Sequence, residues 1–83
     1  DQLRKAALSV INNIAEGSGK RSSKEKLRYY ATALDSTREC VSMVTLLGRQ
    51  SAISQQEHDR LRELCWRVSS MLSKLRSTVN GAR

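Results

Sequence analysis

The sequence predicts an all-α fold, an antiparallel helical bundle of three helices with up-down topology, built as a single domain over residues 1–83. The chain has no proline and only four glycines, so few positions force a helix to end. Apolar residues recur three and four positions apart in three separate segments, as on amphipathic helices. Two of these segments open with a Ser-x-x-Glu capping box, Ser22–Glu25 and Ser54–Glu57.

The first predicted helix runs from about Asp1 to Glu16. Its apolar residues form one wide stripe, namely Leu3, Ala6, Ala7, Val10, Ile11 and Ile14. Gly17 follows at the position where a left-handed residue commonly closes a helix. We therefore expect the chain to turn over Gly17–Gly19 before the second helix begins.

The second predicted helix begins at its capping box and ends near Leu47 or Gly48. One apolar stripe consists of Leu27, Tyr30, Ala31, Leu34, Val41, Val44 and Leu47. A second stripe consists of Tyr29, Ala33, Cys40 and Met43. A helix that is apolar on two faces must bury both. We expect the first stripe to face the chain's own bundle and the second to form an oligomer interface.

The third predicted helix begins at Ser54 and stops at Asn80-Gly81, with Ile53 placed to form a hydrophobic staple. Its apolar positions approach a heptad seam: Leu61, Leu64, Cys65, Val68, Met71, Leu72, Leu75 and Val79. The short connection before it predicts that the second and third helices are antiparallel neighbours. Trp66 lies off the seam, so we expect it at the oligomer interface, the alternative being a partly buried flank of the bundle.

Positive charge is concentrated in two segments of a chain whose net charge is +7. From Lys20 to Arg28 there are five basic residues and one acid, and from Leu64 to Arg83 there are four basic residues and no acid. Antiparallel packing brings these segments to one end of the bundle. The predicted nucleic-acid-binding patch comprises Lys20, Arg21, Lys24, Lys26, Arg28, Lys74 and Arg76. The alternative is a basic surface that binds only water.

The segment Gly17–Ser22 superficially resembles a phosphate-binding loop. A Walker A loop needs glycine in place of Ile14, serine or threonine in place of Arg21, and a preceding strand, so we reject a nucleotide site. Two alternatives stay open. The start of the second helix and its basic neighbours attract phosphate, or the segment is a turn with solvated bases.

No group of residues is spaced for catalysis, so we expect a non-enzymatic protein without metal or cofactor. His58 has no partner at ligand spacing and is expected to be a solvated helix residue. Cys40 and Cys65 lie on apolar stripes and are expected to behave as small buried hydrophobes, which fits a reducing, cytoplasmic location. No apolar run approaches the ~18 residues of a membrane span, so no membrane partner is expected.

The segments Gln2–Val10 (Q-L-R-K-A-A-L-S-V) and Asn13–Gly19 (N-I-A-E-G-S-G) resemble the signature of the bacterial four-helix bundle proteins encoded in 23S rRNA intervening sequences. The resemblance continues through Ser22–Glu25, Tyr29-Tyr30, Ala33-Leu34, Ser36, Glu39 and Ile53-Ser54. Two positions depart from it: Ile11 replaces the family's proline, and Val41 replaces an acid. The family also has a leading helix before Gln2, which we expect to be missing here.

The resemblance implies a helical bundle that assembles as a homopentamer, with no known catalytic residues. It also implies a structural motif made of Asn13, Glu16, Gly17 and Gly19. In that motif Glu16 accepts from N–H groups at the start of the second helix, and the glycines supply turn conformations. A related branch, the accessory variability proteins of diversity-generating retroelements, binds nucleic acid and a reverse transcriptase. We therefore expect a self-assembling protein that binds RNA or DNA, the alternative being a structural or protein–protein adaptor oligomer.

Overall fold

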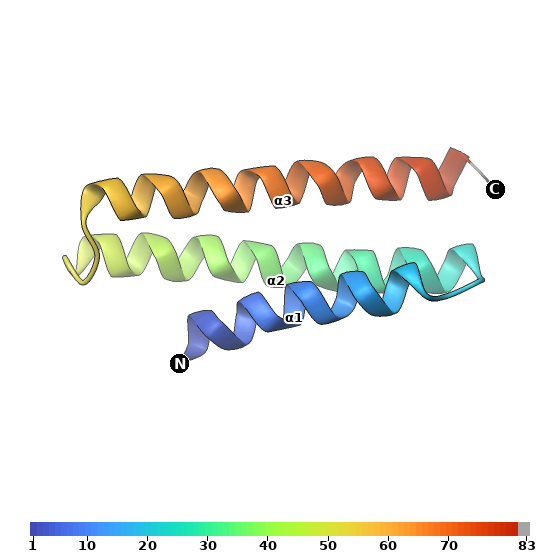
Figure 1. Cartoon of the computed structure of the whole chain (residues 1–83), viewed down its shortest axis with the longest axis horizontal. Helices are drawn as coiled ribbons and strands as arrows, with labels where there is room; N and C mark the ends of the chain where they lie inside the picture. The colour runs from blue at the N-terminus through green and yellow to red at the C-terminus, as the bar shows by residue number, and fades with distance from the viewer. Residues whose placement is uncertain (82–83) are drawn as a thin grey trace.

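The structure is a computed structural model that describes residues 1–81. The chain folds into three α-helices, α1 (Gln2–Ser18), α2 (Ser23–Arg49) and α3 (Gln55–Gly81), and the described residues contain no strand. Successive helices are antiparallel, and α2 lies between α1 and α3 (Figure 1). The Cα atoms span 45 × 21 × 13 Å, so the helices form a flat layer. The all-α prediction is confirmed.

Both predicted capping boxes lie at helix starts. The Ser22 side chain accepts from the Glu25 backbone N–H at 3.3 Å and caps α2. At α3 the exchange is reciprocal: Glu57 N–H donates to Ser54 Oγ at 3.0 Å, and Ser54 N–H donates to Glu57 Oε1 at 2.8 Å. Accepting that bond holds the pKa of Glu57 below its usual range. The capping predictions are therefore confirmed by contacts between the predicted atoms.

The end of α1 differs from the prediction. The helix continues through Gly17 to Ser18, and Gly19 caps it with a right-handed φ of −84°. No glycine among residues 1–81 has a positive φ, so the left-handed conformation expected at Gly17 is wrong, whereas Gly19 lies in the turn after α1 with a right-handed backbone. Gly17 is instead a site of close approach, since a Cβ there would lie 2.8 Å from Cε1 of Tyr30. The left-handed residue lies in the other connection, where Ser51 has a φ of 55°.

Residues of both apolar stripes of α2 pack within the chain. Between α2 and α3, a cluster of Tyr30, Ala33, Leu34 and Leu72 is flanked by Ile14, Val68, Leu75 and Val79. Between α1 and α2, a second cluster of Ala6, Val10 and Cys40 is flanked by Leu3, Ala7, Ile14, Met43, Cys65 and Val68. The expectation that the second stripe faces another subunit is wrong for Ala33 and Cys40, which are 0% and 6% exposed. A middle helix buries two faces because it has a neighbour on each side.

A small polar network joins α1 to α2. The hydroxyls of Ser9 and Ser36 lie 2.7 Å apart across the two helices. Asn13 Nδ2 donates to the Ser9 carbonyl at 2.8 Å and to Ser9 Oγ at 3.2 Å. Asn13 therefore orients the serine that bridges the helices, one turn before α1 reaches its glycine contact.

Candidate nucleic-acid interface

The topology brings the basic segments to one end of the layer. Tyr30, near the start of α2, shares a core cluster with Leu72 of α3, and Leu75 and Val79 pack against it. The connection between α1 and α2 therefore lies beside the last turns of α3 (Figure 1). We call this region the basic end and define it by Lys20, Arg21, Lys24, Lys26, Arg28, Lys74 and Arg76. Arg83, the last base counted in the sequence, lies outside the described residues.

Two of these cations lie against the ring of Tyr29. Lys20 Nζ lies 5.4 Å from the centre of its ring, and Arg28 Cζ lies 5.2 Å from it. Cation–π attraction at such distances holds a cation near an aromatic face. Tyr29 is half-buried at this site. Its ring therefore contacts basic side chains of its own chain instead of lying free for a second subunit.

Lys26 caps the C-terminal end of α1. Its Nζ donates to the Ser18 carbonyl at 3.1 Å and to the Gly17 carbonyl at 3.4 Å. The last carbonyls of a helix lack partners within the helix and carry its negative end, so a cation there is favourable. The hydroxyls of Ser18 and Tyr30 lie 3.1 Å apart at the same place. Lys26 is thus a predicted phosphate-binding residue whose ammonium group already bonds to backbone carbonyls of its own chain.

Glu16 does not have the role that the resemblance implied. Its side chain is exposed, and Oε2 lies 3.9 Å from Lys20 Nζ, one turn along the chain. The start of α2 is capped by Ser22 instead. Ser22, on the connection itself, supplies the acceptor for the first turn of α2. Glu16 is therefore left on the surface.

The other bases differ in how accessible they are. Arg21 and Lys24 are exposed beside the first turn of α2, where backbone N–H groups add positive potential. Lys74 is exposed on α3. Arg76 is half-buried, and its Nε is buried with no hydrogen-bond partner among the described residues. Arg21, Lys24 and Lys74 are therefore exposed cations of the basic end, and Arg28, against the Tyr29 ring, is exposed as well.

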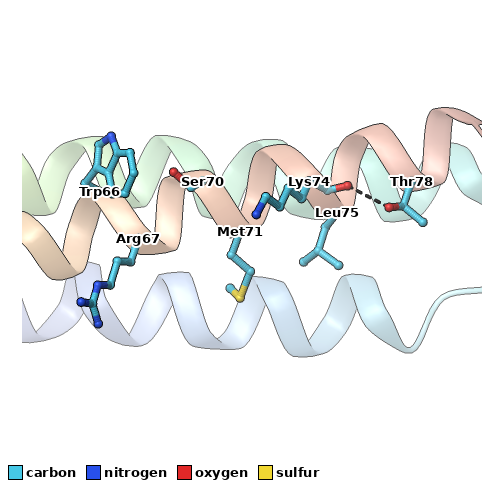
Figure 2. A pocket seen from close by; sticks show the side chains of 7 residues that line it. All are labelled: Trp66, Arg67, Ser70, Met71, Lys74, Leu75 and Thr78. Carbon is cyan, nitrogen blue, oxygen red and sulfur yellow. Dashed lines mark hydrogen bonds between the residues drawn. The ribbon is translucent and has the colours of Figure 1, made fainter.

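The predicted interface residues do not form one surface. Ala33 and Cys40 are in the core, and Tyr29 and Met43 are half-buried along α2. Trp66 is 69% exposed on α3. Seven α3 side chains line a shallow hollow of about 600 Å³ beside it (Figure 2): Trp66, Arg67, Ser70, Met71, Lys74, Leu75 and Thr78.

Sequence reasoning missed an apolar groove between α1 and α3. It measures about 230 Å³ and is lined by Ala7, Val10, Ile11, Thr37, Cys40, Leu61, Leu64, Cys65 and Val68. Ile11 is 61% exposed at its rim. Periodicity placed all of these residues except Thr37 on apolar stripes, but Ile11 and Leu64 are exposed in the structure. Periodicity carries no information that α1 and α3 stand apart. The only signal was Ile11 itself, at the edge of an unusually wide stripe.

The remaining titratable groups form no site. His58 Nδ1 lies 3.0 Å from Asp59 Oδ1, and bonds from His58 and Gln55 hold the Asp59 pKa below its usual range. Burial raises the pKa of the Cys40 and Cys65 thiols. Within residues 1–81, no three His, Cys, Asp or Glu side chains are grouped as metal ligands. None of the described helices combines the length and apolar character that crossing a membrane requires.

Comparison with known proteins gives one match. The model of the 23S rRNA-intervening sequence protein family matches residues 1–74, which include all of α1 and α2 and most of α3. No curated protein and no solved structure matches the chain.

Proposed function

The chain belongs to the 23S rRNA-intervening sequence protein family, and we propose that it is a non-enzymatic, self-assembling protein that binds the phosphate backbone of RNA or DNA. The observation that carries the proposal is the meeting of the α1–α2 connection with the last turns of α3. Exposed Arg21 and Lys24 from one segment and Lys74 from the other then act on the same polyanion. Lys20 and Arg28, which both lie against the Tyr29 ring, add positive charge to the same region.

Phosphate is the ligand that this arrangement suits. Lysine and arginine that neutralise phosphates release condensed counterions, which gives affinity without sequence preference. A net charge of +7 on 83 residues also attracts a polyanion over a distance. Binding is therefore expected to be strong at low salt and to weaken steeply as salt increases.

The test is fluorescence anisotropy of labelled RNA and DNA, titrated between about 50 and 200 mM salt. The variant Arg21→Glu/Lys24→Glu reverses the two exposed charges beside α2. Its matched control is Arg4→Glu/Lys5→Glu, the same charge change on exposed residues at the far end of α1 (Figure 1). The proposal predicts a large loss of nucleic-acid affinity for Arg21→Glu/Lys24→Glu and a small loss of affinity for Arg4→Glu/Lys5→Glu.

The variant at the basic end is also expected to reduce the slope of log affinity against log salt by about two, because each phosphate contact contributes about one. The reduction is expected to be the same for every nucleotide sequence tested. Equal losses for the two variants would mean that only net charge matters, and the basic end would then have no special role.

Self-assembly is the second part of the proposal, and a homopentamer is what the family resemblance implies. The apolar α1–α3 groove favours contact with another protein surface, since Ile11 and Leu64 at its rim are exposed apolar side chains. The same groove supports the alternative function, a structural or adaptor oligomer with no nucleic-acid role, and a reverse transcriptase is one partner to test. Light scattering measures the assembly, and a monomer at high protein concentration would contradict it.

The free cysteines support a location for this activity. Cys40 and Cys65 are not joined in a disulfide, and both lie in or against the cluster between α1 and α2. We place the protein in the reducing cytoplasm on that basis.

A further inference from the structure

We propose that the outer ridge of α3 binds single-stranded nucleic acid, with one base stacked on Trp66. The ridge consists of Arg62, Trp66, Ser70, Ser73, Lys74 and Ser77. The proposal rests on the proposed function and names the class of nucleic acid that this surface selects.

Trp66 points away from the rest of the chain. Val68 and Leu72 face the core, and at about 100° per residue Trp66 lies some 160° from Val68 around the helix. In Figure 2 the indole stands on the opposite side of α3 from Met71 and Leu75. It is 69% exposed, the largest exposure among the big apolar side chains of the described residues. A flat aromatic face is therefore open to a ligand.

The neighbours of Trp66 on the ridge are polar. Positions three, four, seven and eight residues away on a helix share its surface. After Trp66 these positions carry hydroxyl and basic side chains, and before it they carry Arg62, His58 and the two acids Glu63 and Asp59. The anchor of a protein interface normally lies within an apolar patch. Ser70, Ser73 and Ser77 offer hydroxyl groups, which suits a strand whose backbone is polar. The apolar side chains of the adjoining hollow, Met71 and Leu75, lie on the other side of α3 from the indole (Figure 2).

The charge of the ridge matches a nucleic-acid strand. No acid occurs from Leu64 onward. Asp59 and Glu63 share this side of α3 but precede Trp66, and their carboxylates are bonded to Gln55 and His58 and to Arg60 and Arg67. The stretch that follows Trp66 is therefore positive towards the basic end, with Lys74 common to both surfaces.

The spacing along α3 suits an extended strand. Trp66, Ser70 and Lys74 lie on successive turns, about 6 Å apart at ~1.5 Å per residue. The Lys74 side chain runs back along the helix in the direction of Ser70 (Figure 2). A strand lying along α3 thus meets an aromatic face, a hydroxyl and an ammonium group in succession. A duplex keeps its base faces stacked, so only an unpaired base can stack on Trp66.

Trp66 is the only tryptophan in the chain, so intrinsic fluorescence reports this contact alone. The experiment titrates the protein with oligouridylate, oligodeoxythymidylate and a duplex of equal length at low salt. Indole fluorescence and anisotropy of the labelled oligonucleotide are measured in the same samples. We expect both single strands to quench Trp66 over the same concentration range in which anisotropy rises, and the duplex to raise anisotropy without quenching.

The variants separate stacking from general binding. Trp66→Leu is expected to weaken single-strand binding about 5- to 100-fold, the usual range for losing one stacked base, and to leave duplex binding unchanged. Trp66→Phe keeps an aromatic face and is expected to retain most of the affinity. The matched control is Leu46→Ala, another exposed apolar side chain, 53% exposed, near the end of the layer remote from the basic end. Circular dichroism checks that each variant remains helical.

Each result that differs from these expectations would overturn the stacking inference, and the results differ in what they say of the proposed function. If single strands bind without quenching and Trp66→Leu binds them normally, the stacking inference is overturned while the proposed function stands. If neither single strands nor duplex bind at low salt, both are overturned. Quenching by an acidic polypeptide but not by oligonucleotides would assign the ridge to a protein partner. Dissociation of an oligomer by Trp66→Leu would make Trp66 a subunit contact instead.

Discussion

Replacing Gly17 by alanine is expected to destabilise the fold by about 1–3 kcal/mol, although alanine is the better helix former by about 1 kcal/mol. The new Cβ would lie 2.8 Å from Tyr30 Cε1, 3.0 Å from Tyr29 Cβ and 3.1 Å from Tyr30 Cδ1. Tyr30 is 3% exposed and cannot move into solvent. Overpacking of this kind costs about 1–3 kcal/mol, and displacing the ring also breaks its hydroxyl contact with Ser18, worth about 1 kcal/mol.

Thermal unfolding followed by circular dichroism measures this loss. For a domain of this size, each kcal/mol lowers Tm by about 4–8 °C. The matched control is Gly19→Ala, two residues along. A Cβ there meets nothing nearer than 3.7 Å, and the backbone is right-handed. Gly19→Ala is expected to change Tm little or to raise it slightly.

A second replacement tests the cause. If the clash with Tyr30 is responsible, Tyr30→Leu should relieve it, and the combined variant should lose less stability than the sum of the two single losses. Wild-type stability for Gly17→Ala would refute the close-approach explanation. Strict additivity with Tyr30→Leu would place the strain elsewhere, and the next contact in distance is Tyr29 Cβ at 3.0 Å.

Two further predictions concern helix ends. Lys26→Met should lower stability by about 0.5–1 kcal/mol in urea unfolding, because it removes the side-chain donor to the Ser18 carbonyl and one donor to the Gly17 carbonyl, which also accepts from the Lys20 N–H. Replacing the exposed Lys24 by Met should not lower stability, and equal urea midpoints for the two variants would contradict the capping role. Glu57→Gln should lower stability at neutral pH and progressively less in acid. The lowered pKa of Glu57 means that its contribution is present above its unfolded-state pKa and is lost as pH falls through the folded value. Urea midpoints for wild type and Glu57→Gln at several pH values measure this, and a constant gap would contradict it.

Helix starts were predictable from the sequence because their contacts are local. Ser22 and Ser54 bond to residues three positions away, so the motif and the structure involve the same atoms. The end of α1 was not predictable in this way. Whether the chain leaves the helix at Gly17 or continues depends on the Tyr30 ring, which lies on another helix.

The basic end and the two apolar stripes of α2 show which features a sequence pattern can predict and which it cannot. Antiparallel topology was enough to bring the basic segments together. It could not reveal that Lys26 closes α1, since that depends on side-chain reach across a turn. Likewise, two apolar stripes require two neighbours, but they do not say whether the second neighbour is another subunit or α1.

The order of the helices in the layer has a kinetic consequence. Each packed helix pair is consecutive in sequence, since α2 packs against α1 and α3 while the backbones of α1 and α3 stay apart. Either helical hairpin therefore assembles by closing one short connection, and low contact order of this kind is associated with rapid folding. Because α2 packs against both α1 and α3, separation of α1 from the layer would leave the α2–α3 pair in contact. Such an opening would expose Cys40 and Met43 of the second stripe, while Ala33 would stay packed with Leu72, and it would offer a route for exchanging α1 between chains.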